Sequence, residues 1–367
     1  MIKLSQMPYE VTFDDILLLP GHSDFSVDLE RTKISLASKV GKHLTLTLPI
    51  MSSPMAGVTE QEMAITMARA GGIGVIHFFM EFEEQLMQVK AVKKQGLIVG
   101  AAVSDLTALG YKHCENLVKV GVDLISLESL HSDTADMISM IKKLRKNFPK
   151  IEVSTAHVVT AEATEAVIRA GATSVRVGIG GGSHCTTRLM TGVGRPQVSA
   201  VLDCAKTAHK YKVPLISDTG IKYPGDIAKA LACGASAVMI GSMFAGTDKS
   251  PGEVVRRKGM YYKYSSGNCS SQRTFKQSLL DSLKGVKREI VNVLKHRLNN
   301  GVTTHFEEGI SGFIPYSGTT VAVLDKLETG IRRSLWYVGA TDVPNLQKKA
   351  RAIVTSHNTL AESKPRI

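Results

Sequence analysis

The sequence predicts an α/β protein folded as a single (β/α)8 barrel, and three observations support this prediction. Short apolar runs rich in Val and Ile recur along residues 47–242. Stretches with helical periodicity and good helix-forming residues separate these runs. Strands that alternate with helices pair in parallel, and eight such units complete a barrel of about 250 residues. An open, doubly wound parallel sheet is the alternative.

Each strand is expected where an apolar run is too short for a helix. The eight expected strands are Thr47–Ser53, Gly72–His77, Leu97–Val103, Leu124–Leu130, Ile151–Val158, Ser174–Gly180, Pro214–Gly220 and Ser236–Ser242. The helices expected between them include Glu60–Ala70, Glu84–Lys94, Thr134–Arg145, Ala161–Ala170, Gln197–Lys210 and Gly225–Ala232. The connection after the sixth strand is long, because it holds both a glycine-rich loop and a helix.

A single barrel domain is expected to span residues 1–367. After the eighth unit the chain becomes more polar and basic from Gly246 to Thr304, and an amphipathic helix is expected from about Thr274 to Asn299. Long excursions from the top face of a barrel often form lids, so we expect residues 260–305 to be a flap. Residues 347–367 are expected to form a C-terminal tail.

Composition argues against several functional classes. The five cysteines, at positions 114, 185, 204, 233 and 269, form no C-x-x-C pair, which disfavours disulfide frameworks and structural zinc and favours a reducing compartment. Neither a signal peptide nor a membrane-spanning run is evident, so a cytoplasmic location is expected. The net charge of +12 suits an anionic small molecule. With aromatics at 5% and dispersed basic residues, nucleic-acid binding is not expected.

The strongest local signal for chemistry is the loop Gly178–Arg188, with the sequence GIGGGSHCTTR. It follows the sixth strand, and barrel active sites lie at the C-terminal ends of the strands. Its glycines let backbone amides approach a ligand, and Ser183 adds a hydroxyl that can contact a phosphate. Cys185 would ionise more easily beside Arg188 and free amides, which favours a nucleophile. The alternative is a glycine turn with a buried cysteine.

Two further strand ends carry candidate ligand-binding groups. Asp218 ends the seventh strand, where a carboxylate can accept hydrogen bonds from ribose hydroxyls or could instead cap the next helix. Phosphate commonly binds in barrels after the seventh and eighth strands, which here end in Gly220, Gly241 and Ser242. Close packing at the barrel rim is the alternative. We favour ligand binding because these residues stand at the strand ends where barrels commonly bind ligands.

The sequence does not decide the roles of three other polar residues. His77 and His157 end strands, but a lone histidine is more often structural than catalytic. Glu308, preceded by Glu307, could belong to a surface charge pair or could reach the active site as an acid.

These residues occur in motifs that resemble the family of IMP dehydrogenases and GMP reductases. The similarity covers nearly the whole chain, and its motifs are Thr12–Pro20 (TFDDILLLP), Ser52–Met55 (SSPM), Gly71–His77 (GGIGVIH), Val175–Gly180 (VRVGIG), Cys185–Arg188 (CTTR), Gly192–Gln197 (GVGRPQ), Ile240–Met243 (IGSM), Ser250–Glu253 (SPGE), Glu308–Gly312 (EGISG) and Tyr337–Ala340 (YVGA). The family is a (β/α)8 barrel that forms tetramers, so the resemblance implies a homotetramer.

The resemblance also implies roles for the site residues. Cys185 would attack C2 of the purine to form a covalent nucleotide intermediate, while Thr187 and Glu308 would relay a proton to departing ammonia. Asp218 would bind the ribose, and the 5′-phosphate would be bound by Ser183, Gly220, Gly241 and Ser242. The nicotinamide cofactor would meet Glu128, Ser129 and Gly180. Backbone carbonyls of Gly180, Gly182 and Cys185 would hold a monovalent cation, which in the family is usually potassium.

The family runs this covalent chemistry in two directions. A dehydrogenase oxidises IMP with NAD and hydrolyses the intermediate to XMP, whereas a reductase deaminates GMP and reduces the intermediate to IMP with NADPH. Dehydrogenases usually carry a regulatory tandem domain after the second helix, for which this chain has no room. They also carry an Arg-Tyr pair on the flap, and none occurs between Gly267 and Glu308. The sequence therefore favours a GMP reductase.

Several departures from the family affect the cofactor half of the site. Glu128 stands where the family has aspartate, His157 where it has asparagine, and Ala56 where it has aspartate after Ser-Pro-Met. The Gly-Gly of the seventh loop reads Thr219-Gly220. An IMP dehydrogenase and a non-catalytic relative that binds purine nucleotides are the alternatives.

Overall fold

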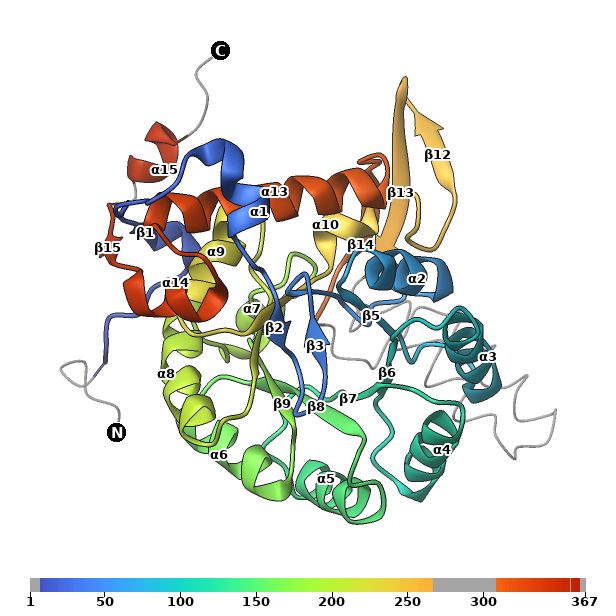
Figure 1. Cartoon of the computed structure of the whole chain (residues 1–367). Coiled ribbons are helices and arrows are strands. Elements are labelled where there is room, and N and C mark those ends of the chain that lie inside the picture. Colours follow the sequence, from blue (N-terminus) through green and yellow to red (C-terminus); the bar gives the residue numbers. More distant parts are fainter. Residues whose placement is uncertain (1–6, 267–307, 357, 364–367) are drawn as a thin grey trace.

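Eight parallel strands close into a barrel in the computed structural model, which describes residues 7–266, 308–356 and 358–363 (Figure 1). In spatial order the strands are β4 (Ile50–Ser52), β5 (Ile73–Ile76), β6 (Gly100–Val103), β7 (Leu124–Leu127), β8 (Glu152–Val158), β9 (Ser174–Val177), β10 (Leu215–Asp218) and β11 (Ala237–Ile240). Pairing of β11 with β4 closes the barrel. The predicted (β/α)8 fold is confirmed, and the described residues contain no second domain.

Helices ring the barrel (Figure 1). They are α2 (Gln61–Arg69), α3 (Phe82–Lys93), α4 (Ala108–Lys119), α5 (Ala135–Asn147), α6 (Ala161–Ala170), α8 (Gln197–Lys210), α9 (Pro224–Ala232) and α13 (Thr320–Val338). Threonine side chains cap several N-termini by accepting backbone N–H groups, at Thr107, Thr134, Thr160 and Thr319. Helix α13 contacts both α9 and α2, so it completes the ring between these two helices.

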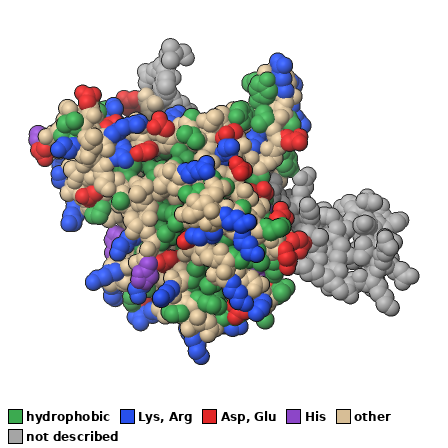
Figure 2. All heavy atoms as spheres, turned by 45° about the vertical axis from the view of Figure 1, so that its right-hand side comes forward, with side chains coloured by type: hydrophobic (Ala, Val, Ile, Leu, Met, Phe, Trp, Pro, Cys, Tyr) green, Lys and Arg blue, Asp and Glu red, His purple; other side chains and the backbone are tan. Residues whose placement is uncertain are grey.

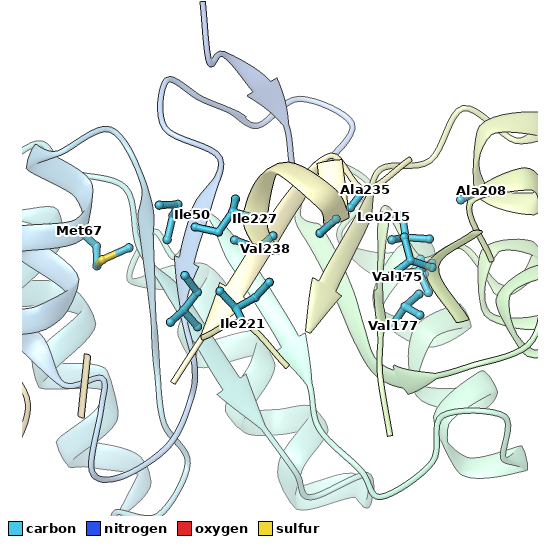
Figure 3. Close-up of a cluster of buried hydrophobic side chains, with 14 of the residues drawn as sticks. Ile50, Met67, Val175, Val177, Ala208, Leu215, Ile221, Ile227, Ala235 and Val238 are labelled. Carbon is cyan, nitrogen blue, oxygen red and sulfur yellow. The ribbon is translucent and has the colours of Figure 1, made fainter. Parts of the chain in front are cut away.

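The apolar core has two parts. The larger part lies between the strands and the surrounding helices, where residues such as Ile50, Val175 and Leu215 pack against Met67 of α2 and Ala208 of α8 (Figure 3). The smaller part lies inside the barrel and consists of Val40, Leu46, Met51, Ile73, Val75, Ala102, Leu124, Ile216, Ala237 and Met239. This division follows from strand alternation, since successive side chains point to opposite faces.

A short hairpin formed by β2 (Ser38–Lys39) and β3 (Thr45–Leu46) contributes Val40 and Leu46 to the inner cluster. Glu152, at the start of β8, is buried and accepts the backbone N–H of Lys42 in the hairpin turn at 2.8 Å. Because Glu152 begins its strand, the hairpin lies at the N-terminal end of the barrel. The hairpin leaves the opposite, C-terminal end of the barrel open for a functional site.

The chain after the eighth strand forms an antiparallel sheet beside the barrel. It consists of β12 (Val254–Arg257), β13 (Met260–Ser266) and β14 (Ser311–Pro315), with Ser266 paired to Ser311. The predicted flap, residues 260–305, therefore begins in β13. Its remainder, including the helix predicted at 274–299, lies outside the described residues.

The two ends of the chain meet in another antiparallel pair. Strand β15 (Ala352–Val354) pairs with β1 (Ile16–Leu18), and α14 (Val343–Lys349) precedes it. The described part of residues 347–367, which were predicted to form a tail, therefore contains the end of α14 and the strand β15. The remaining short elements are the 3-10 helices η2 (Phe13–Asp15) and η3 (Val27–Leu29) and the helices α1 (Glu30–Lys33), α7 (Thr187–Thr191), α10 (Ser242–Ala245) and α15 (Asn358–Glu362).

Lys and Arg side chains are scattered among acidic ones on the face drawn in Figure 2 and form no continuous basic patch there. Among the helices of the described ranges, none is long and apolar enough to cross a membrane.

Candidate active site

The Cys185 loop follows β9 at the C-terminal end of the barrel. Its path requires glycine at Gly178 and Gly180, which have φ angles of +148° and +78°. A Cβ atom at Gly178 would collide with the carbonyl oxygen of Asp218. The Cys185 sulfur is half-buried and lies 3.1 Å from the Thr187 hydroxyl oxygen. The predicted nucleophile and its predicted neighbour are thus in direct contact.

A segment more than 120 residues later pairs with this loop. The Thr186 N–H donates to the Glu308 carbonyl at 2.8 Å, and the Ile310 N–H donates to the His184 carbonyl at 2.9 Å. These bonds form an isolated antiparallel bridge between Cys185 and Gly309. The backbone of Glu308 is therefore fixed beside the cysteine loop, which brings together the three residues predicted to be catalytic.

Two of the residues predicted to bind phosphate share a cavity, and the other two lie at strand ends. Ser183 and Ser242 line one cavity of about 700 Å³, together with Ile310 and residues of β14 and α13. Ser242 begins α10, directly after Gly241, where a Cβ atom would lie 2.9 Å from the Met55 sulfur. Gly220 follows β10 with a φ of +81°. Free backbone N–H groups at such a helix start and glycine turn can bind an anion.

A buried arginine, for which no role was predicted, organises the mouth of the barrel. Arg176 of β9 donates from Nη2 to Asp218 Oδ2 at 2.6 Å and from Nε to the same oxygen at 3.0 Å. Its Nη1 donates to Ser126 at 2.9 Å and also forms an ion pair with Glu128. Burial lowers the pKa of Arg176, but Glu128 and Asp218 outweigh it and raise the pKa overall. The Arg176 cation thus connects Asp218, which is predicted to bind the ribose, with Glu128, which is predicted to bind the cofactor.

The two carboxylates keep part of their binding capacity. Among the described residues, Asp218 Oδ1 and Glu128 Oε2 make no hydrogen bond, so each carboxylate has one oxygen that could accept a ligand hydroxyl. An arginine within a strand of otherwise small and apolar residues was a usable signal, since a buried charge needs a partner. The sequence did not reveal which partner.

The two strand-end histidines differ in their surroundings. His77 is buried, with Nε2 3.3 Å from Glu60 and Nδ1 accepting the Phe79 N–H at 3.0 Å, which favours the structural interpretation. His157 is partly exposed, and its Nε2 lies 3.9 Å from Asp218 Oδ2. Burial lowers the pKa of His157, although Asp218 opposes this shift. His157 therefore belongs to the Arg176 cluster, where a neutral imidazole is favoured.

The predicted cofactor and cation groups can be compared with this geometry. Glu128 lies in the Arg176 cluster, whereas the Ser129 hydroxyl bonds locally to the backbone of His131. Of the carbonyls predicted to hold a cation, that of Gly182 accepts the Cys185 N–H at 3.1 Å, and those of Gly180 and Cys185 accept no hydrogen bond from described residues. Two carbonyls thus remain able to coordinate an ion. The described side chains form no cluster of three or more metal-ligating groups.

Comparison with known proteins identifies the family of the chain. The model of the IMP dehydrogenase / GMP reductase domain matches residues 10–366. The chain is 36% identical to an inosine-5'-monophosphate dehydrogenase of Cryptosporidium parvum, covering 96% of this chain and 94% of the relative. It is 32% identical to the protein of that name from Borreliella burgdorferi, covering 97% and 96%.

Relatives of this name differ in length. The protein from Nitrosopumilus maritimus is 28% identical over an alignment of 478 positions, whereas the Cryptosporidium parvum alignment spans 396. The longer alignment includes many residues without a counterpart in this chain of 367. The shorter one shows that a protein named as a dehydrogenase can lack most of this extra length. A missing inserted domain therefore does not separate the two activities of the family.

Proposed function

Because the chain belongs to the IMP dehydrogenase / GMP reductase family, we propose that it is a GMP reductase, which converts GMP to IMP and ammonia with NADPH. The family assignment itself establishes only an oxidoreductase that acts on purine nucleotides. The observation that carries the finer proposal is the contact of Cys185 with Thr187 beside the paired Glu308 backbone, in a chain without an Arg-Tyr pair between Gly267 and Glu308.

Cys185 would add to C2 of GMP as the thiolate, and the exocyclic amine would leave as ammonia. The Glu308 carboxyl would supply the proton that the departing amine needs, and the Thr187 hydroxyl, 3.1 Å from the sulfur, would pass it on. NADPH, when bound, supplies the hydride that reduces C2. The thiolate then leaves to give IMP. Because hydride reduces the covalent intermediate in this direction and water does not attack it, no group that activates a hydrolytic water is required.

The remaining groups would bind and orient the substrates. Asp218 would receive the ribose hydroxyls at its uncommitted oxygen, while Ser183, Gly220, Gly241 and Ser242 would hold the phosphate. Glu128, Ser129 and Gly180 would face NADPH. The carbonyls of Gly180 and Cys185 would coordinate potassium, together with the second lone pair of the Gly182 carbonyl, which already accepts the Cys185 N–H. A homotetramer is proposed from the family resemblance.

The names of the relatives favour a second candidate, the oxidation of IMP to XMP with NAD. Incubating the purified chain with GMP and NADPH, and separately with IMP and NAD, each with potassium, distinguishes the two. Loss of NADPH with formation of IMP is expected. Formation of XMP and NADH would instead assign the dehydrogenase. Nucleotide binding with neither turnover would indicate a binding protein.

A further inference from the structure

Thr219 has a backbone conformation that a residue with a branched side chain rarely adopts. Its φ angle is +95°, in the left-handed region that favours glycine, and it lies between Asp218 and Gly220 in the loop after β10. Such outliers persist only where the surrounding structure fixes them, and they concentrate at functional sites. The contacts of the Thr219 side chain indicate what fixes it here.

The Thr219 hydroxyl donates to Gln197 Oε1 at 3.2 Å. The side chain of Gln197 is buried, and its Nε2 lies 2.7 Å from the Val177 carbonyl and 3.2 Å from the Asp218 carbonyl. Gln197 therefore bridges the strand end that leads into the Cys185 loop and the strand end that carries Asp218. The Thr219 hydroxyl supplies the hydrogen-bond donor for Oε1 of the Gln197 side chain.

Thr219 also packs directly against the glycines of the Cys185 loop. A Cβ atom at Gly181 would lie 2.6 Å from the Thr219 hydroxyl oxygen, and one at Gly178 would lie 3.0 Å from it. Both glycines therefore leave the space that the Thr219 side chain occupies. Glycine at position 219 would leave that space unfilled and would remove the bond to Gln197.

We propose that Thr219 is a positioning residue, which couples the loop of Asp218 and Gly220 to the loop that carries Cys185. This inference rests on the proposed nucleotide site but not on the direction of the reaction. Because Thr219 touches both loops, binding of a nucleotide to the first loop should restrict the second. The positioning role belongs to the Thr219 side chain, because glycine could adopt the same backbone conformation without strain.

Three variants separate the contributions of backbone and side chain. Thr219→Ser keeps the hydroxyl, Thr219→Ala keeps only Cβ, and Thr219→Gly removes the side chain and relieves the unfavourable φ angle. Thermal unfolding should show that Thr219→Gly is folded, with a melting temperature no lower than that of the parent. GMP binding, measured by titration calorimetry, should weaken about three- to tenfold in Thr219→Ala and Thr219→Gly, and Thr219→Ser should restore it.

The coupling itself can be measured through the rate at which iodoacetamide alkylates Cys185, followed by peptide mass spectrometry. In the parent and in Thr219→Ser, saturating GMP should slow this rate, and in Thr219→Gly the protection at equal GMP occupancy should be several-fold smaller. Equal GMP affinity and equal protection in all four proteins would overturn the proposal. Binding and alkylation need no turnover, so failure of the reductase assay alone would not affect this result. Absence of GMP binding by the parent would refute the nucleotide site and this inference with it.

Discussion

The guanidinium of Arg176 lies 2.6 Å from Asp218, and the same group forms an ion pair with Glu128. The three residues come from β9, from the end of β10 and from the residue after β7, so one cation connects strands on both sides of β8. The proposed ribose ligand and the proposed cofactor ligand thus share a single partner. A change in one half of the site should therefore affect the other.

Replacing Arg176 with Met should lower the free energy of unfolding by about 3–5 kcal/mol, because two buried carboxylates lose their counter-charge. Urea denaturation followed by circular dichroism measures this loss. Arg31→Met is the matched control, since Arg31 pairs with Asp325 at 3.2 Å in an exposed position and should contribute less than about 1 kcal/mol. Equal losses in the two variants would contradict the importance of the buried network.

Replacing Cys185 with Ala should reduce the rate of GMP reduction by at least about 1000-fold, because the covalent step is lost. GMP binding should persist, since the ribose and phosphate ligands are other residues. Absorbance of NADPH and calorimetric titration provide the two measurements. Cys233→Ala is the control, because burial raises the pKa of Cys233 to about 11 and leaves its thiol protonated at neutral pH. Substantial turnover by Cys185→Ala would rule out a covalent role.

Replacing Glu308 with Gln should lower kcat by about 100- to 10,000-fold, the range for a lost general acid or base. The structure should be preserved, because the bond between Glu308 and Thr186 uses the backbone carbonyl of Glu308. Steady-state kinetics with an unchanged melting temperature would support the relay. The exposed Glu162 of α6 offers a control, and Glu162→Gln should keep the parental rate. If Glu308→Gln also keeps that rate, another group supplies the proton.

Acid should destabilise the fold through His113. Its side chain is buried on α4, with Nε2 2.6 Å from Gln85 Oε1, and burial lowers the pKa of His113 to about 4. In the unfolded chain His113 takes up a proton near pH 6.5, whereas in the folded chain it does so only near pH 4. The stability that the neutral, buried His113 contributes is therefore complete above pH 6.5 and is lost as the pH falls toward 4. Between pH 7 and pH 5 the loss should be about 2 kcal/mol.

His113→Gln removes the titrating group but keeps an N–H donor for Gln85. Urea denaturation at pH 7 and pH 5 should therefore show a smaller pH-dependent loss in His113→Gln than in the parent. The same pH dependence in both proteins would assign the acid sensitivity to other groups.

The sequence allowed the eight strands to be placed because each buried strand is a short apolar run, as at Val175 and Leu215. It also made Cys185 the candidate nucleophile, because four nearby glycines mark its loop. The predictions did not name α4, although its buried residues recur with helical spacing. Nor could they pair Thr186 with Glu308 or β1 with β15, because backbone hydrogen bonds between distant segments leave little trace in side-chain patterns.

The pairing of β1 with β15 has a consequence for the order of assembly during synthesis. Residues 16–18 are synthesised more than 330 residues before their partners at 352–354. By then all eight barrel strands have been synthesised, so the ribbon that joins the ends of the chain can form only after the barrel strands are complete. Among the strands that the structure describes, β1 therefore waits longest for its partner during translation.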